Sequence, residues 1–194
     1  MSKGSSFASG VAAIQAALDA LGFPSMIIGG IAVIAHGVAR TTADVDATLW
    51  LDDDGDLPRI VAGLEHAGIE PRIADVLTFA RTSRVVLLRH TESNVPLDLS
   101  LATLPFEREA LEGAMERSFA GVSLRVASVE ALIIYKMVAA RPRDLDDVEQ
   151  LLARHPSEVD LDRVRKTIEQ FSELLEDSTR PILFADITRR LRAK

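Results

Sequence analysis

Hydrophobic positions in the first two thirds of the chain recur at two spacings, one typical of helices and one typical of strands. Helical spacing predicts helices at residues 7–21, 31–38, 58–67, 74–80 and 106–117. Unbroken or alternating apolar runs predict strands at residues 25–28, 44–51, 84–89 and 95–101, and a small hairpin at residues 119–126. Together these segments predict an α/β (α+β) fold in which helices flank a mixed β-sheet.

From residue 128 onward the spacing is helical throughout. The pattern predicts helices at residues 128–140, 144–154, 157–175 and 180–191. Ser128 and Ser157 each precede an acidic residue in the first turn, an arrangement that caps the N-terminus of a helix. We therefore expect an α/β domain at residues 1–127 and a helical C-terminal domain at residues 128–194.

Composition excludes several classes of protein. The 194 residues are 47% hydrophobic and 26% charged, which is typical of a globular chain. A formal net charge of −7 argues against a general nucleic-acid coat protein, because such proteins neutralise phosphates with excess Lys and Arg. Cysteine is absent, which excludes disulfides, thiolate zinc sites and cysteine nucleophiles. We expect a cytoplasmic protein without a membrane span, because no signal peptide is visible and the longest apolar run is interrupted by glycines and His36.

Candidate chemistry begins at Gly29 and Gly30, which follow the strand predicted at residues 25–28 and directly precede a helix. Glycine lets a phosphate approach the backbone, and the first helical turn offers unpaired N–H groups. Asp44 and Asp46 lie two positions apart on the next predicted strand, so both carboxylates face one side and can share a divalent cation. Taken singly, the glycines also suit a simple tight turn, and the acids also suit an exposed strand face.

A third acid, Asp98, lies in a strand whose other face is formed by valine and leucine. A lone carboxylate in such a strand is costly to bury unless it is paired, hydrogen-bonded or bound to a metal. Pro96 leaves open the alternative of a strand at the edge of the sheet, because proline avoids central strands. Three acids on neighbouring strands beside a glycine turn form the arrangement used in two-metal phosphoryl or nucleotidyl transfer.

The stretch GGIAVIAHGVARTTADVD resembles the signature of the DNA polymerase beta-like nucleotidyltransferase superfamily. Its Arg-x-Thr-x-Asp-x-Asp form is most similar to the AbiEii-type toxin nucleotidyltransferases of bacteria and their uncharacterised relatives. VPLDLSL, which contains Asp98, resembles the strand that carries the third carboxylate, and ALIIYKMVAARPRDLDDVEQLL resembles the downstream helical signature of that group. The resemblance covers residues 25–155 and implies a nucleotidyltransferase-type sheet followed by a C-terminal helical bundle.

The resemblance implies a role for each residue that matches a motif. Asp44, Asp46 and Asp98 would be the catalytic residues and the metal ligands, and Asp98 would also accept the proton of the attacking hydroxyl. The nucleotide would be bound by Gly29, Gly30, Arg40, Thr42, Lys136, Arg143 and Asp147. Two Mg²⁺ ions are expected together with the NTP.

The implied function is Mg²⁺-dependent transfer of a nucleoside monophosphate from an NTP to an acceptor hydroxyl on RNA, such as tRNA, or on a protein. The implied biological role is that of the toxin of a toxin–antitoxin system, with a cognate antitoxin as partner. The alternative is a catalytically inactive module of the same fold that binds nucleotides or a partner, although the presence of all three acids argues against it. Arg81, Arg84 and Arg89 suit an acceptor groove or, as we expect, a solvated strand edge.

Lys136 lies among apolar residues of a predicted helix, where an unpaired charge is costly. It therefore needs an anionic partner, either a nucleotide phosphate or the acids Asp144 and Asp147 in a salt-bridge cluster. We expect the phosphate, because Pro142 breaks the helix between Lys136 and those acids. The same break makes Asp144 a candidate cap for the next helix.

Overall fold

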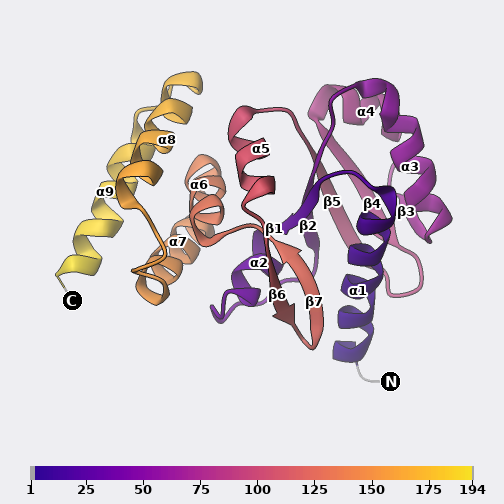
Figure 1. The fold of residues 1–194 in the computed structure, drawn as a ribbon, viewed down its shortest axis with the longest axis horizontal. Helices are drawn as coiled ribbons and strands as arrows, with labels where there is room; N and C mark the ends of the chain where they lie inside the picture. Colours follow the sequence, from indigo (N-terminus) through magenta and orange to yellow (C-terminus); the bar gives the residue numbers. More distant parts are fainter. Residues whose placement is uncertain (1–2, 194) are drawn as a thin grey trace. The chain divides into compact units, whose positions relative to one another are not determined.

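A computed structural model describes residues 3–193 (Figure 1). The chain divides into two compact units: the first ends at Ala127, and the second comprises His36–Ala39 and the chain from Ser128. The strands are β1 (Ser25–Ile28), β2 (Val45–Trp50), β3 (Ile69–Pro71), β4 (Val85–His90), β5 (Val95–Ala102), β6 (Met115–Phe119) and β7 (Val122–Val126). The helices are α1 (Lys3–Leu21), α2 (Gly29–Ala35), α3 (Leu57–His66), α4 (Val76–Ser83), α5 (Pro105–Glu112), α6 (Val129–Ala139), α7 (Pro142–Arg154), α8 (Leu161–Leu174) and α9 (Thr179–Arg192).

One seven-stranded mixed sheet, in the order β3-β4-β5-β2-β1-β7-β6, forms the first unit together with helices α1 to α5, so the predicted α/β fold is confirmed. Strand β2 pairs with β1 in the antiparallel direction and with β5 in the parallel direction. Strand β5 pairs on its other side with β4. It is therefore an interior strand despite Pro96, and the edge-strand alternative is wrong.

The two faces of strands β2, β5 and β4 differ in burial, as their alternating sequences predict. One face is apolar and buried, and consists of Val45, Ala47, Leu49, Val86, Leu88, Leu97, Leu99 and Leu101. Helix α1 packs on this face, where Ile14 and Leu18 are fully buried. The opposite face carries Asp46 and Asp98, which are both partly exposed. The core thus forms on one side of the sheet and leaves the acids accessible on the other.

The region between β5 and β7 differs from its predicted structure. The helix predicted at residues 106–117 is too long, because α5 ends at Glu112 with Gly113 as its C-cap. Met115–Phe119 instead forms β6, whose side chains alternate in exposure and which pairs with β7. The hairpin turns at Ala120 and Gly121, with φ angles of 49° and 84°. The sequence pattern also misses β3, because three residues are too few to show an alternation.

The second unit is helical, and its helices α6 to α9 are the salmon to yellow ribbons of Figure 1. Ser128 caps α6 as predicted, since its side chain accepts a 3.2 Å hydrogen bond from the backbone N–H of Ala131. The N-cap of α7 is Arg141, and Asp144 caps the same helix from its first turn, where its Oδ2 accepts a 3.3 Å hydrogen bond from the backbone N–H of Arg141. The predicted cap at Ser157 is wrong, because α8 is capped at Asp160. None of the helices within residues 3–193 is long and apolar enough to span a membrane.

Candidate active site

Asp46 and Asp98 lie beside each other on neighbouring strands. The parallel pairing of β2 with β5 makes the two residues register partners. Neighbouring strands are about 4.8 Å apart, so both carboxylates leave the same face of the sheet from adjacent backbone positions. The parallel register therefore brings together two of the three predicted catalytic acids from segments that are distant in sequence.

Asp44 lies immediately before β2, which begins at Val45. It is exposed, and its Oδ1 accepts a 2.7 Å hydrogen bond from the hydroxyl of Thr42. This hydrogen bond restrains the Asp44 carboxylate at the start of the strand that carries Asp46. Thr42, predicted to bind the nucleotide, thus contacts one of the predicted catalytic acids.

The glycine pair makes room for the side chains that the sequence assigns to the same site. Gly29 has a φ of +62°, and a Cβ atom there would lie 1.9 Å from Asp46 Oδ2. A Cβ atom at Gly30 would lie 2.7 Å from Thr42 Oγ1 and 3.2 Å from Arg40 Cζ. A tight turn alone would require only the positive φ of Gly29. The start of α2 is therefore in close contact with Asp46, Thr42 and Arg40.

Replacing Gly29 with alanine should destabilise the protein more than the same change at Gly22. Gly22 also has a positive φ, +73°, but no atom lies within 4 Å of its would-be Cβ. Gly22→Ala should therefore cost only backbone strain, about 1–2 kcal/mol. Gly29→Ala should cost about 1–3 kcal/mol more, because Asp46 must also move. Urea unfolding of the three proteins measures this difference, and equal losses would show that Gly29 does not hold Asp46 in place.

Arg72 is a residue of this site that the sequence pattern does not predict. It directly follows β3, and its backbone N–H donates a 2.9 Å hydrogen bond to the carbonyl of Leu87. Leu87 is in turn the register partner of Asp98. The guanidinium of Arg72 reaches over Leu87 and forms an ion pair with the Asp98 carboxylate. Because β3 is so short, only the structure shows that Arg72 shares a face with the acids.

Carboxylates are candidate ligands for a divalent cation. Within residues 3–193, no three His, Asp or Glu side chains are grouped so that they could hold a metal ion. The three acids therefore do not form such a group among the described residues, and the Asp98 carboxylate pairs with Arg72. The donor set still fits a divalent cation, since carboxylates are hard oxygen ligands and Asp46 and Asp98 are adjacent in register.

In the second unit, Lys136 is held between two carboxylates. Its Nζ lies 3.0 Å from Asp144 Oδ1 and 2.8 Å from Asp147 Oδ2. All three residues are buried, with exposed fractions of 6%, 6% and 3%. The expectation that Pro142 keeps Lys136 from these acids is wrong, because Pro142 starts a new helix, α7, that packs on α6. The geometry supports the salt-bridge alternative.

The remaining predicted nucleotide ligand is Arg143, which directly precedes Asp144 in the chain. Arg143 is exposed in the first turn of α7. Arg141, next to it in the chain, forms a 3.0 Å ion pair from Nε to Asp144 Oδ2. The nucleotide-binding roles that the resemblance implies for Lys136, Arg143 and Asp147 stay predictions.

A mixed sheet with two register-paired carboxylates beside a glycine turn fits the nucleotidyltransferase-type α/β fold that the motifs resemble. Comparison with known families is more specific: the nucleotidyl transferase AbiEii toxin family, of type IV toxin–antitoxin systems, matches residues 18–193. The chain belongs to this family and is a nucleotidyltransferase, which confirms the resemblance seen in its motifs. Membership implies a nucleotide substrate and a cognate antitoxin. A comparison with curated proteins found no match.

Two solved structures share the fold. The solution structure of the antibiotic-resistance factor ANT(2'')-Ia is similar with a TM-score of 0.57 and 21% identity, covering 87% of this chain and 92% of that chain. An antigenic nucleotidyltransferase-like protein from Paracoccidioides brasiliensis is similar with a TM-score of 0.54 and 15% identity, covering 95% and 91% of the two chains. At these identities, the similarity establishes the fold alone.

Proposed function

We propose that the chain transfers a nucleoside monophosphate from an NTP to an acceptor hydroxyl, with Asp44, Asp46 and Asp98 around the reacting groups. The pairing of Asp46 with Asp98, beside Gly29, is the observation that supports this reaction best. The acceptor oxygen forms a bond to the α-phosphorus, the bond from that phosphorus to the β-phosphate oxygen breaks, and pyrophosphate leaves.

The three acids would have two different roles in the reaction. Asp44 and Asp46 would hold divalent metal, and Asp98 would take the proton of the attacking hydroxyl. Nucleotidyltransferases of this family generally use divalent metals, and we propose Mg²⁺. When bound, the metal would neutralise charge on the triphosphate and on the attacking oxygen. Asp98 would accept this proton once its carboxylate separates from Arg72.

The nucleotide would lie at the start of α2. Gly29 and Gly30 carry no side chains there, and Arg40 and Thr42 pack against Gly30, so a cation and a hydroxyl adjoin the backbone at the start of the helix. A guanidinium is well suited to the oxygens of a triphosphate. The acceptor hydroxyl would belong to RNA, such as tRNA, or to a protein, and the chain would act as the toxin of its toxin–antitoxin pair.

The test incubates the purified chain with each of the four NTPs, labelled at the α-phosphate, and with total RNA or protein extract, in Mg²⁺ or in EDTA. In a separate melting experiment on the purified chain, we expect one NTP together with Mg²⁺ to raise the melting temperature of the protein. A ligand that binds only the folded state stabilises that state. Label should enter a macromolecule in Mg²⁺ and not in EDTA. Binding without transfer would favour the inactive-module alternative, and absence of both would contradict the proposal.

A further inference from the structure

Arg72 is held to the sheet by its backbone and to Asp98 by its side chain. Its backbone N–H donates to the carbonyl of Leu87, the register partner of Asp98, and its guanidinium forms an ion pair with the Asp98 carboxylate. Within residues 3–193 this is the only ion pair of Arg72, and its buried Nε has no hydrogen-bond partner. Because an unsatisfied buried donor is costly, the guanidinium is incompletely satisfied in this position.

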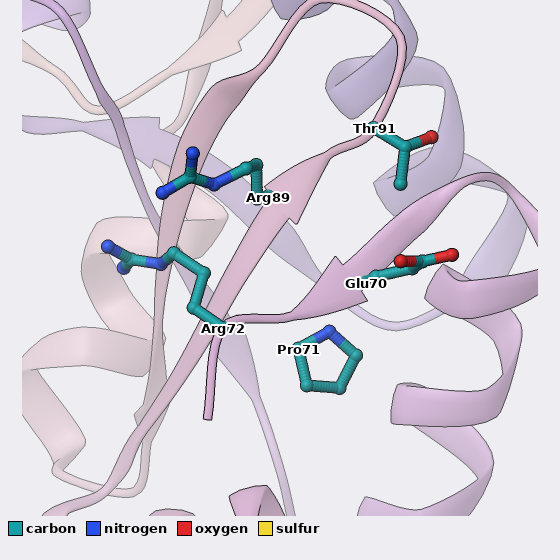
Figure 2. Close-up of a pocket in the computed structure, with 5 residues that line it drawn as sticks. All are labelled: Glu70, Pro71, Arg72, Arg89 and Thr91. Carbon is teal, nitrogen blue, oxygen red and sulfur yellow. The ribbon is translucent and has the colours of Figure 1, made fainter. Parts of the chain in front are cut away.

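A cavity of about 200 Å³ beside Arg72 leaves room for its side chain to move (Figure 2). The cavity lies at the β3–β4 edge of the sheet and is lined by Glu70, Pro71, Arg72, Arg89 and Thr91. Figure 2 shows that the side chain of Arg72 extends away from Glu70. Arg72 is thus directed to Asp98 in this structure, although it shares the cavity with a second acid.

Glu70 is a second carboxylate that Arg72 can pair with. It is the register partner of Arg89, and both lie on the face of the sheet that carries Asp98. Arg72 follows Glu70 by two positions, so its side chain leaves the same face. Glu70 is exposed, and among the described residues its carboxylate has no hydrogen bond or ion pair. Arg89 donates instead to the amide oxygen of Asn94, at 2.6 Å.

The ion pair of Arg72 with Asp98 competes with a divalent cation for the same carboxylate. Asp98 is 41% exposed, and an ion pair at such a position is weak. The guanidinium places a positive charge beside Asp98, and a divalent cation held by its register partner Asp46 would be repelled by that charge. A cation beside Asp46 can therefore use Asp98 fully only when Arg72 has left it.

We propose that Arg72 is a positioning residue that holds the Asp98 carboxylate until a divalent cation binds, and then moves into the cavity toward Glu70. This inference rests on the proposed function, in which divalent metal is held next to Asp98. Arg72 balances the charge of Asp98 while no metal is present, and it sets the metal concentration at which the site loads. Glu70 lowers the cost of release, because Arg72 exchanges one carboxylate for another instead of losing its partner.

The test measures binding of Mn²⁺ alone to the purified chain, without NTP or acceptor, from the electron paramagnetic resonance signal of the unbound ion. Mn²⁺ takes the same oxygen ligands as Mg²⁺. Binding that Asp46→Asn removes is assigned to the site. Arg72→Gln should tighten this binding about fivefold, because Asp98 is no longer paired.

Two variants control for the charge and for the position of the substituted residue. Arg72→Lys keeps a cation beside Asp98 and should leave Mn²⁺ binding within about twofold of the wild type. Arg89→Gln removes a guanidinium that lines the same cavity but donates to an amide, and should change Mn²⁺ binding less than about twofold.

Glu70→Gln tests the second partner of Arg72. Alone, it should weaken Mn²⁺ binding about twofold, because Arg72 loses the carboxylate to which it moves. Combined with Arg72→Gln, the same change should have no effect, because no guanidinium is left to move. This non-additivity separates the exchange from a general loss of negative charge. Equal effects of Glu70→Gln with and without Arg72 would contradict the exchange.

Unchanged Mn²⁺ binding in Arg72→Gln, or equal tightening in Arg72→Gln and Arg89→Gln, would overturn the proposal. Thermal melting in EDTA shows whether each variant is folded. Because this assay contains no reaction, it separates the two proposals. Tighter Mn²⁺ binding by Arg72→Gln in a protein that transfers no nucleotide would contradict only the proposed transfer, and unchanged Mn²⁺ binding in an active protein would contradict only the role of Arg72.

Discussion

Asp46→Asn should abolish nucleotidyl transfer while the protein stays folded. Asp46 is the central acid of the site: it is paired in register with Asp98, follows Asp44 by two residues, and contacts the backbone at Gly29. Asparagine has nearly the same size, so the contact at Gly29 is retained. A neutral amide cannot balance the charge of a divalent cation, and the transfer rate should fall by about three orders of magnitude or more.

The measurement is the initial rate of incorporation of labelled NMP, together with thermal melting of the metal-free protein. The melting temperature should stay the same or rise, because Asp46→Asn removes repulsion from the neighbouring Asp44. Asp146→Asn makes the same chemical change at an exposed residue of α7 and should leave the rate within about twofold. Transfer that survives in Asp46→Asn at the wild-type rate would show that these acids do not form the active site.

Lys136→Met should lower the stability of the protein strongly. The ammonium group of Lys136 is the buried cation within hydrogen-bond distance of both Asp144 and Asp147. Its removal leaves buried carboxylates without that charge, which costs about 3–5 kcal/mol. In a chain of this size, such a loss lowers the melting temperature by about 10 °C. Arg141, which also contacts Asp144, compensates little because its side chain is 78% exposed.

Two further variants separate this interpretation from a general effect of the substitution. Lys136→Met combined with Asp144→Asn and Asp147→Asn removes all three charges and should recover part of the lost stability. Lys166→Met changes an exposed lysine of α8 and should alter the melting temperature little. An unchanged melting temperature with weakened NTP binding in Lys136→Met would show that Lys136 serves the nucleotide instead.

Alternation along the strands was enough to predict which acids face away from the core. The pattern of β2 and β5 separates Asp46 and Asp98 from their apolar neighbours, and the structure has the same separation. The pairing of these strands could not be predicted, because alternation fixes the face of a residue and not its partner on the next strand. Arg72 was missed for the same reason, since its place beside Asp98 depends on the pairing of β3, β4 and β5.

The anionic partner of Lys136 shows a different limit of sequence reasoning. The apolar surroundings of Lys136 correctly indicated that its charge needs an anion. Pro142 was interpreted as a separator, but proline suits the first turn of a helix, and α7 begins there and brings Asp144 and Asp147 back to α6. Whether a helix break separates or apposes its flanking residues depends on packing, which one segment of sequence does not encode.

The parallel pairing of β2 with β5 also determines when the active site can form during folding. Thr48 and Ser100, register partners on these strands, are 52 residues apart in the chain. Closing so long a loop is entropically costly, and sheets built from distant pairings fold slowly. During translation, Gly29, Asp44 and Asp46 are synthesised well before Asp98. With the catalytic roles proposed for these acids, the nascent chain stays without its third acid until β5 has emerged and inserted between β2 and β4.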